Sequence, residues 1–569
     1  DAIKFQIYFA DELMINKHKR FNHFKKQSFS KNTWFKLLNF FKKKNINLYC
    51  DIFGKKAFEI ANESGVDGFK IHSSDLNNFN LLKLVSKTKK KIFLSAGGST
   101  LEEISYALNI LKLNNERPTI LLHGFQSYPT KLENCDLFKI QLYKKLFKKN
   151  FDIGYQDHLS ADDPLNFKTP LIAMKLGAKY LEKHITIGRD KKGIDYYSSL
   201  EPYEFKKFVR YIRQNENKKN INPETILGKL NLNKALGEKT LEKMSPSEIS
   251  YRNTVKKVWF LNRNISRGKK INIKNIIMKR PDKLNSNNIN WEAFRNKKLK
   301  KIVKKDTQIN NSMFKNDVTA IIVARNSSKR LKNKAVRKIC DIDTIEHLIK
   351  RVQRSKEINR IILCTTKNKN DDLLIKIAKK NRVLSYRGSE KDVLHRMLGA
   401  IKKTKTNVIV RITGDDILID PYFLDKTVKY HLLNNLQYTD AKKLPSGIDV
   451  EVFDRDLLET IYKLAKDTSG TEYLTYYVTN HKNQFRIGSL DVSNKYRKKI
   501  RLTLDNIKDF KVIKIFLEQM QKRKKLFDYK FEDLIKFYKK NKKIFSLNLN
   551  PSFKLKKINT DFIWTRLFN

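Results

Sequence analysis

Two histidines each end a short segment that we interpret as a strand. The segments are Gly154-Tyr-Gln-Asp-His158 and Tyr180-Leu-Glu-Lys-His184. Imidazole is a common ligand of divalent metals, and side chains that follow neighbouring parallel strands meet at one edge of a sheet. One such histidine alone is more often structural, but the pair predicts a metal site formed by His158 and His184.

Four further polar residues fall in, at or after other strand-like segments of the same region: Lys4, Lys70, Ser73 and Ser95. Singly, each lysine is more often a surface residue. Two ammonium groups and two hydroxyls at one mouth are suitable donors for a carboxylate and a phosphate. Their joint placement favours a site for a small anionic substrate beside the predicted metal.

The second half of the chain carries basic residues in a predicted strand-to-helix loop. Arg325, Ser328, Arg330 and Lys334 are spaced so that they can surround a triphosphate, with backbone N–H groups helping. The alternative is an ordinary polar loop in a chain that is rich in lysine.

Carboxylates follow two later strands. Asp415 comes shortly after the strand that contains Arg411, and Asp505 ends the segment Leu502-Thr-Leu-Asp505. Oxygen ligands of this kind suit Mg²⁺. Because carboxylates after strands often cap helices, neither is decisive alone, but together with the basic loop they predict a metal-assisted phosphate site.

Alternating strand and helix patterns must position the residues of the first half. From Ile3 to about Asn217 they predict a parallel sheet with helical crossovers, and the length favours a closed (β/α)8 TIM barrel. The count of strands is one short of closure, so the first strand of such a barrel is missing. The predicted strands are residues 3–8, 47–52, 68–71, 92–95, 119–123, 153–155 and 180–184.

Two further domains are expected after the barrel, which we assign to residues 1–235. A small β-rich module with tight turns is predicted for residues 241–314. Residues 318–550 again alternate strands and helices, which predicts an open, doubly wound, Rossmann-like α/β domain with its ligands at the carboxyl ends of the strands. The strands expected there are residues 318–324, 361–365, 383–386, 408–412, 448–453 and 485–490.

Composition narrows the class of protein. The 569 residues include 40% hydrophobic residues, enough for two or three packed domains. A net charge of +60 would suggest nucleic acid, but the lysines are spread along the whole chain and no nucleic-acid-binding motif accompanies them. We favour a solvated basic surface that attracts anionic substrates. We expect no specific nucleic acid, no membrane span and no signal peptide, and four separated cysteines favour a reducing cytoplasm.

Residues 1–217 resemble the N-acetylneuraminate (sialic acid) synthase family in the order and spacing of their motifs. The module that follows resembles that family's antifreeze-like (SAF) domain, with Lys279-Arg-Pro281 as its marker. The main motifs are Ile3-Lys-Phe-Gln6, Lys70-Ile-His-Ser73-Ser-Asp75, Leu94-Ser-Ala-Gly97, Tyr128-Pro-Thr130, Gly154-Tyr-Gln-Asp-His158, Glu182-Lys-His184, Arg189-Asp-Lys-Lys-Gly-Ile-Asp195 and Ser199-Leu-Glu-Pro202.

This resemblance implies a reaction between phosphoenolpyruvate and an open-chain N-acetylhexosamine-type sugar. A manganese-type divalent metal on His158 and His184 would polarise the sugar aldehyde. Residues that would hold phosphoenolpyruvate are Lys4, Lys70, Ser73 and Ser95.

The same resemblance assigns three further residues and raises one question about length. Asp75 takes the place of an acid that orients the sugar, and Asp195 matches a substrate-binding acid. Arg280 would reach the partner subunit's site in a domain-swapped homodimer. The family's first strand, with its acidic site residue, has no counterpart here, so the chain looks like a fragment of a longer product.

Residues 318–550 resemble the spore-coat polysaccharide cytidylyltransferases, relatives of the CMP-sugar synthetases. The matching motifs are Arg387-Gly-Ser389 with Asp392 and Arg396, Gly447-Ile-Asp449-Val-Glu-Val-Phe453, and Asp505 with Asp509. The resemblance implies that Asp415 and Asp505 hold Mg²⁺. Residues that it places at CTP or the sugar acid are Arg325, Ser328, Arg330, Lys334, Arg387, Arg411 and Asp449.

The two families catalyse consecutive steps, so the sequence predicts a bifunctional enzyme that makes a nonulosonic acid and activates it as a CMP-sugar for surface polysaccharide. Two alternatives stay open: a cytidylyltransferase with an inactive barrel, and a non-enzymatic polyanion-binding protein. The acceptor sugar, the identity of the nonulosonic acid and any transfer of product between the domains are left open as well.

Overall fold

The computed structural model describes residues 2–112, 119–125, 127, 129–147, 151–218, 221–283, 288–327, 330–469, 471–546 and 558–568. The chain divides into two units, and each is described by itself. The first comprises Asp1–Ile309 with Trp564–Asn569, and the second comprises Asn310–Ile563.

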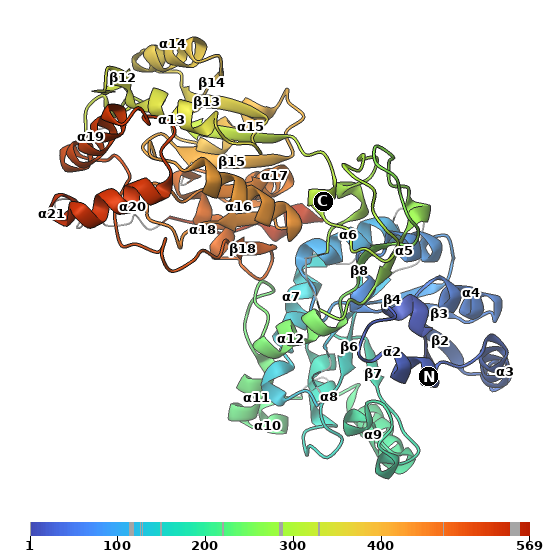
Figure 1. The fold of residues 1–569 in the computed structure, drawn as a ribbon. Helices are drawn as coiled ribbons and strands as arrows, with labels where there is room; N and C mark the ends of the chain where they lie inside the picture. Colours follow the sequence, from blue (N-terminus) through green and yellow to red (C-terminus); the bar gives the residue numbers. More distant parts are fainter. Residues whose placement is uncertain are drawn as a thin grey trace. The chain divides into compact units, whose positions relative to one another are not determined.

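A curled sheet of seven parallel strands forms the centre of the first unit, and the strands follow one another in chain order (Figure 1). In the described part of the chain, β1 and β7 are the two edges of this open sheet. The prediction of seven parallel strands is therefore confirmed. The strands are β1 (Ala2–Ile7), β2 (Asn47–Ile52), β3 (Gly68–Ile71), β4 (Lys91–Ser95), β5 (Thr119–His123), β6 (Asp152–Asp157) and β7 (Tyr180–Lys183).

Helices connect these strands and surround the sheet on its outer side (Figure 1). Local sequence sets where they begin: Ser30 accepts a hydrogen bond from the Thr33 N–H ahead of one helix, and Glu201 and Glu204 form a capping box around Pro202 at another. The helices are α1 (Ala10–Leu13), α2 (Phe21–Gln27), α3 (Lys31–Lys42), α4 (Lys55–Glu63), α5 (Phe79–Ser86), α6 (Leu101–Lys112), α7 (Phe138–Phe147), α8 (Lys168–Lys175), α9 (Pro202–Asn215), α10 (Pro223–Leu227) and α11 (Lys229–Leu236).

Side chains of each strand alternate between the outer core and the inside of the curled sheet. In β3, Phe69 and Ile71 are fully buried in the core between sheet and helices, and Lys70 between them faces inward. The interior also holds an apolar layer, in which the Phe93 ring lies 5.0 Å from that of Tyr49 and 5.6 Å from that of Tyr180. The inward positions therefore combine an apolar layer with polar residues that can meet a substrate.

A small antiparallel pair follows the barrel-like sheet inside the first unit. Strands β8 (Val258–Leu261) and β9 (Ile276–Lys279) pair with each other after helix α12 (Pro246–Val255). The predicted limits of this module, residues 241–314, and its antifreeze-like identity stay predictions.

The end of the chain also packs onto the first unit. The ring of Phe568 lies 4.7 Å from that of Phe147, and the indole N–H of Trp564 donates a 2.6 Å hydrogen bond to Glu242. The sequence prediction ended the last domain at residue 550 and assigned no role to this segment.

A mixed seven-stranded sheet forms the centre of the second unit. Its strand order is β14-β13-β10-β15-β17-β16-β18, with β10 central and parallel to both neighbours and β17 antiparallel to its own. This confirms the predicted Rossmann-like α/β domain. The strands are β10 (Val318–Val323), β13 (Arg360–Thr366), β14 (Leu384–Gly388), β15 (Val408–Thr413), β16 (Tyr438–Asp440), β17 (Glu451–Asp454) and β18 (Ile487–Ser489), beside a hairpin of β11 (Lys338–Ile339) and β12 (Ile342–Asp343).

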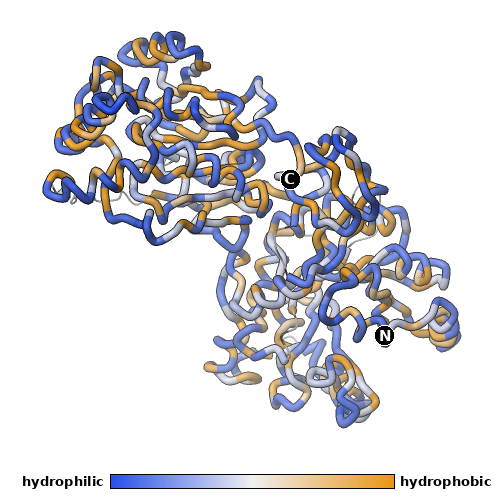
Figure 2. The backbone as a smooth tube through the Cα atoms, viewed as in Figure 1, coloured by the Kyte–Doolittle hydropathy of each residue, from blue (hydrophilic) through white to orange (hydrophobic). Residues whose placement is uncertain are grey.

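Helices pack on this sheet around one large apolar core. Figure 2 shows hydrophobic positions concentrated along the strands, while the helices alternate hydrophobic and hydrophilic positions, as amphipathic packing requires. The helices are α13 (Thr344–Val352), α14 (Asp372–Lys380), α15 (Val393–Ile401), α16 (Pro421–Leu433), α17 (Arg455–Leu464), α18 (Leu474–Thr479), α19 (Ile507–Lys522), α20 (Phe531–Lys540) and α21 (Lys542–Phe545).

Two further features of the described residues are the hydropathy of the helices and the state of the cysteines. No helix in the described part of the chain is both long and apolar enough to cross a bilayer. All four cysteines are free thiols, and Cys50, Cys135 and Cys364 are buried.

Candidate active sites

Four charged side chains meet inside the curled sheet of the first unit. The Lys70 Nζ lies 2.6 Å from Oε1 of Glu182, and the Lys4 Nζ lies 3.6 Å from the same oxygen. Asp51 Oδ2 lies 3.9 Å from the Lys70 Nζ. These residues come from β1, β2, β3 and β7, so the cluster connects one edge strand of the sheet to the other.

Burial and mutual charge set the protonation of this cluster. Burial lowers the pKa of Lys70, but at Lys4 the carboxylates of Glu182 and Asp51 outweigh burial and the pKa is raised. Although burial opposes it, the two ammonium groups hold the pKa of Glu182 below its ordinary value. Burial raises the pKa of Asp51 to about 6. The cluster therefore gains a positive charge when Asp51 takes up a proton, which favours an anionic ligand.

Gln156 of β6 links Lys70 to Ser95. Its Oε1 accepts a 2.9 Å hydrogen bond from the Lys70 Nζ, and its Nε2 donates to Ser95 Oγ at 2.7 Å and to the Gly124 carbonyl at 2.5 Å. Gly124 has φ +116°, and a Cβ there would lie 2.3 Å from the Gln156 carbonyl oxygen. The amide thus holds two predicted phosphoenolpyruvate-binding residues in place.

The two predicted metal ligands of the first unit lie side by side. The ring centroids of His158 and His184 are 5.1 Å apart, and the Nδ1 of His158 is buried without a hydrogen-bond partner among the described residues. Burial lowers the pKa of both imidazoles, so both are neutral, as metal ligation requires. Asp195 Oδ2 lies 3.9 Å from the His184 Nδ1.

These histidines fit a divalent cation as a pair of ligands. Among the residues that the structure describes, no group of three or more His, Cys, Asp and Glu side chains is arranged to hold a metal ion. The two histidines would supply two ligands of such an ion.

Ser73 lies after β3 and is held from α12. Its Oγ is 3.2 Å from the Tyr251 Oη, which in turn lies 3.1 Å from the His72 Nε2. Its carbonyl accepts a 2.8 Å hydrogen bond from Lys256, whose pKa burial lowers to about 8. The helix after the barrel therefore fixes this predicted substrate-binding residue.

Asp75, the predicted sugar-orienting acid, lies in a fully buried ion pair. Its Oδ2 is 2.9 Å from the Lys257 Nζ, and neither side chain is exposed. Ser74 Oγ and Asn78 Nδ2 each donate to the Asp75 carboxylate at 2.7 Å. The structure thus places Asp75 between β3 and the small module. Among the described residues, the partners of its carboxylate are Ser74, Asn78 and Lys257, and not Lys4 or Lys70.

Arg280 follows β9 and lies beside α1 of the same unit. Its backbone N–H donates to the Leu13 carbonyl at 2.9 Å, and its carbonyl accepts from the Ile15 N–H at 3.1 Å. After burial, repulsion by Arg280 is the largest cause that lowers the pKa of His72, so the guanidinium lies near the strand ends of its own chain. Its predicted reach into a partner subunit stays a prediction.

In the second unit, Lys334 lies between the two predicted magnesium ligands. Its Nζ is 2.9 Å from Oδ2 of Asp415 and 3.2 Å from Oδ1 of Asp505. Burial acts to raise the pKa of Asp415, but the ion pair with Lys334 outweighs it and the pKa is lowered. The Lys334 ammonium shows that a positive charge can lie between these two carboxylates, and carboxylate oxygens are suitable ligands for a hard divalent ion.

Further groups surround these carboxylates. Arg330 Nη2 lies 3.0 Å from Oδ1 of Asp505, and Arg501 forms an ion pair with its other oxygen. Burial raises the pKa of Asp449 to about 6, and burial with the nearby charges of Asp415 and Asp449 raises that of Asp416 well above its ordinary value. Predicted residues from the loop after β10 and from the ends of later strands are thus brought together.

Arg411 of β15 is held by a partly buried acid, Glu451. Its Nη1 lies 2.5 Å from Oε2 of Glu451, and its Nη2 donates a 2.8 Å hydrogen bond to the Glu472 carbonyl. Tyr438 Oη donates to the other Glu451 oxygen at 2.8 Å. Strands β15, β16 and β17 therefore share one polar network around this predicted substrate-binding residue.

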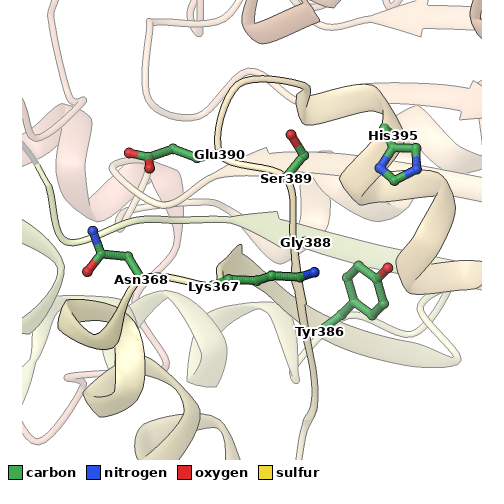
Figure 3. A pocket seen from close by; sticks show the side chains of 7 residues that line it. All are labelled: Lys367, Asn368, Tyr386, Gly388, Ser389, Glu390 and His395. Carbon is green, nitrogen blue, oxygen red and sulfur yellow. The ribbon is translucent and has the colours of Figure 1, made fainter.

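A cavity of about 410 Å³ is lined by Tyr386 and Gly388, the chain neighbours of Arg387, and by five further residues (Figure 3). Arg387 donates hydrogen bonds to the Thr366 and Asn368 carbonyls at 3.0 and 2.6 Å, which fixes one wall. Arg325 Nη1 lies 3.9 Å from Glu390 on the lining. The volume is within the range of small-molecule sites. The lining residues are Lys367, Asn368, Tyr386, Gly388, Ser389, Glu390 and His395.

The sequence analysis gave no role to several residues of these sites. Ser328, which it placed in the triphosphate loop, lies outside the residues that the structure describes. Glu182 and Gln156 stood inside quoted motifs, so their polar types within strands were a usable signal. Tyr251 and Glu451 contact predicted residues that are distant in sequence, and no local pattern indicates such contacts.

Comparisons with known proteins agree with both halves. Residues 1–221 match the model of the NeuB family, and residues 319–546 match that of the cytidylyltransferases. The chain is 39% identical over 234 residues to the protein MJ1063 of Methanocaldococcus jannaschii, covering 41% of this chain and 95% of that protein.

Two further relatives carry descriptive names. The spore coat polysaccharide biosynthesis protein SpsF of Bacillus subtilis is 32% identical over 214 residues, which is 37% of this chain and 89% of SpsF. The N,N'-diacetyllegionaminic acid synthase of Campylobacter jejuni is 34% identical over 242 residues, 42% of this chain and 65% of that synthase.

The fold and the two groups of side chains define a two-part transferase, with one site inside a curled parallel sheet and another on a Rossmann-like domain. The chain belongs to the NeuB family, the sialic acid synthase family, in its first part and to the cytidylyltransferase family in its second. Both are families of enzymes that generally depend on divalent metals, and together they support a bifunctional role in nonulosonic acid biosynthesis.

Proposed function

We propose that this enzyme condenses phosphoenolpyruvate with an N-acetylhexosamine-type sugar and then activates the resulting nonulosonic acid with CTP. The observation that carries the proposal is that each family's polar residues converge in its own unit: two lysines near two neutral histidines in the first, and basic residues around two aspartates in the second. The product of the first reaction is the substrate class of the second.

In the first site, Lys4 and Lys70 bind the phosphate and carboxylate of phosphoenolpyruvate, with Ser73 and Ser95 as further donors. His158 and His184 would hold Mn²⁺ or a similar ion, which when bound supplies Lewis-acid polarisation of the sugar aldehyde. The methylene carbon of phosphoenolpyruvate bonds to the aldehyde carbon as the aldehyde C=O π bond breaks, and the aldehyde oxygen takes up a proton. Water then adds to the former enol carbon and loses a proton. The bond from that carbon to the phosphate oxygen breaks, so inorganic phosphate leaves and a keto group remains.

Sugar selection is a separate part of this proposal. Asp195 lies beside His184 and is placed to accept hydrogen bonds from sugar hydroxyls. Asp75 contributes through its ion pair with Lys257, which fixes the segment that contains Ser73. In a domain-swapped homodimer, Arg280 would contact the substrate of the partner subunit, at the strand ends of that subunit's curled sheet.

In the second site, Arg325, Arg330 and Lys334 bind the triphosphate of CTP, together with Ser328. Asp415 and Asp505 would hold Mg²⁺, which when bound neutralises phosphate charge. The anomeric hydroxyl of the sugar acid bonds to the α-phosphorus, its proton leaves, and pyrophosphate departs. Residues that orient the nucleotide and sugar acid are Arg387, Arg411 and Asp449.

The proposal includes the arrangement of the whole chain. A barrel-type domain at residues 1–235 and an antifreeze-like module at 241–314 form the synthase, and residues 318–550 form the cytidylyltransferase. We place the enzyme in the cytoplasm, where its phosphorylated substrates are found, and assign its product to surface polysaccharide.

A second candidate is cytidylyl transfer alone, with an inactive first unit. The observation that favours it is the open sheet, because β1 and β7 do not pair with each other in the described part of the chain.

Two half-reactions test the proposal separately. Phosphate release from phosphoenolpyruvate is measured with Mn²⁺ and a panel of N-acetylhexosamines, and pyrophosphate release from CTP is measured with Mg²⁺ and prepared nonulosonic acids. We expect both. Release of pyrophosphate alone would support the second candidate, and release of neither would reject both.

A further inference from the structure

The Lys334 ammonium occupies the space between the two carboxylates that the proposed function assigns to a divalent metal. Its Nζ lies 2.9 Å from Asp415 and 3.2 Å from Asp505, which are contributed by segments 81 and 171 residues away along the chain. Only 16% of the lysine side chain is exposed. This is a partly buried contact of three charged groups and not an exposed surface ion pair.

The backbone around Lys334 is fixed, so only the side chain is available to move. Thr344 Oγ1 donates a 2.5 Å hydrogen bond to the Lys334 carbonyl, and Asn333 precedes it in the left-handed region with φ +57°. A lysine side chain has four rotatable carbon–carbon links between this anchor and its charge. The ammonium can therefore reach a second partner while the loop stays in place.

Two more cationic side chains form ion pairs with Asp505. Arg330 Nη2 lies 3.0 Å from one carboxylate oxygen, and Arg501 pairs with the other while its Nε lies 3.3 Å from Asp509. A divalent ion at Asp415 and Asp505 would replace the Lys334 ammonium and face the charge of Arg330 as well. Like charges at such distances repel each other, most strongly at the less exposed Lys334.

Arg330 and Lys334 differ from Arg501 in one respect that matters for a nucleotide. Both belong to the loop that follows the central strand β10, and the Arg330 side chain is 51% exposed. A triphosphate at this loop offers them several negative oxygens. Arg501 is held by Asp509 in addition to Asp505, so it can remain where it is.

We propose that Lys334 and Arg330 occupy the metal-binding carboxylates in the nucleotide-free enzyme and exchange them for the triphosphate when CTP binds. The exchange frees Asp415 and Asp505 for the divalent cation, so nucleotide and metal bind cooperatively. This inference rests on the proposed cytidylyl transfer and adds an order to it: the carboxylates are blocked until the nucleotide arrives. By linkage, the cation strengthens CTP binding by the same factor.

Mn²⁺ binding without nucleotide tests the exchange directly. Full-length wild type and variants are titrated with MnCl₂, and free Mn²⁺ is followed by its electron paramagnetic resonance signal. Lys334→Met removes the blocking charge, and we expect it to bind Mn²⁺ at the second unit about tenfold more tightly, equivalent to about 1.4 kcal/mol. Any Mn²⁺ held by His158 and His184 is the same in all variants.

Matched variants separate this effect from a general change of charge or fold. Lys332→Met removes an exposed charge from the same loop and should behave as wild type, and Lys334→Arg keeps the blocking cation and should do the same. Adding Asp415→Asn to Lys334→Met should abolish the gain. Circular dichroism confirms that each variant is folded.

Equilibrium dialysis of CTP gives the reciprocal measurement. We expect wild type to bind CTP more tightly with Mn²⁺ than with a chelator, and Asp415→Asn to lose most of that difference. The exchange would be overturned if Lys334→Met bound Mn²⁺ no more tightly than wild type does. If the wild type still released pyrophosphate from CTP, the proposed function would stay intact. Failure to bind CTP or release pyrophosphate under any condition would reject the proposed function itself, and the exchange with it.

Discussion

Lys70 contacts more members of the first site than its motif alone indicates, because it touches Glu182, Gln156 and Asp51 at once. Its ammonium is the group nearest to Glu182, while Lys4 lies further away. A lysine held in this way keeps its charge in a fixed position for an incoming anion. Lys334 in the second unit also pairs with two carboxylates, Asp415 and Asp505, but we propose that it leaves them when CTP binds.

Replacing Lys70 should separate the two activities. We expect Lys70→Met to lower phosphoenolpyruvate-dependent phosphate release about 100-fold or more, as loss of a preorganised charge does. Pyrophosphate release from CTP with a supplied nonulosonic acid should not change, since Lys70 lies in the first unit. Lys89→Met, an exposed position, is the control, and a similar loss in both assays would contradict the assignment.

Asp51 should make stability depend on pH. Burial raises its pKa to about 6, from an ordinary value of 3.8, so the folded state binds a proton more tightly than the unfolded state. The resulting stabilisation is fully present below about pH 4 and is lost as pH rises through about 6.

Asp51→Asn removes this term. The free energy of unfolding of the variant, relative to that of wild type, should be higher at pH 8 than at pH 5 by about 1–2 kcal/mol. Urea unfolding followed by tryptophan fluorescence measures the first unit specifically, because Trp34, Trp259, Trp291 and Trp564 all belong to it. A difference between wild type and variant that is independent of pH would contradict the raised pKa.

At the scale of elements, the buried parallel strands could be predicted closely from sequence. Runs such as Val318–Val323 and Thr119–His123 consist mostly of apolar residues at consecutive positions, which is how a strand covered on both faces is recognised. Strand β16 (Tyr438–Asp440) was missed because it has only three residues and ends in an aspartate.

Pairings between distant elements could not be predicted in the same way. The His158–His184 pair was found because both residues end adjacent strands, β6 and β7. The Asp75–Lys257 ion pair joins residues 182 apart, and neither residue lies in a pattern that points to the other. Family motifs identified Asp75 as a site residue, but its burial against Lys257 became visible only in three dimensions.

The Asp75–Lys257 pair should be a major link between β3 and the small module. Neither side chain is exposed, so removing one charge leaves the other buried and unpaired. We expect Lys257→Met to destabilise the first unit by about 3 kcal/mol. Combining it with Asp75→Leu should restore a large part of this loss, measured by urea unfolding with tryptophan fluorescence. Additive losses in the double variant would show that the pair itself is not the cause.

At the scale of the whole molecule, a net charge of +60 acts on every anionic ligand. Phosphoenolpyruvate, CTP and the sugar acid are all anions, so the field raises their local concentration at low ionic strength. We expect KM for phosphoenolpyruvate and for CTP to rise several-fold between about 0.05 and 0.5 M NaCl, as screening shortens the Debye length. The kcat values should change little, because the paired charges inside each site are shielded from salt.

The polyanion-binding alternative makes a different whole-molecule prediction. It requires salt-dependent retention on DNA or heparin without turnover, whereas an enzyme steered by its charge shows the same salt dependence in KM. Steady-state kinetics in a series of NaCl concentrations distinguishes the two. A KM that is constant across the series would remove the role that we give to the net charge.

The central claim is that one chain carries out two consecutive reactions, and an isotope label tests it most directly. Full-length protein is mixed with phosphoenolpyruvate labelled with ¹³C at its three carbons, a panel of N-acetylhexosamines, CTP, Mn²⁺ and Mg²⁺, and the products are separated for mass spectrometry. We predict a CMP-linked nonulosonic acid that carries the label, and its mass identifies the sugar. Absence of any labelled CMP-sugar, when a supplied nonulosonic acid is converted in a parallel reaction, would contradict the two-step account and leave a cytidylyltransferase with an inactive first unit.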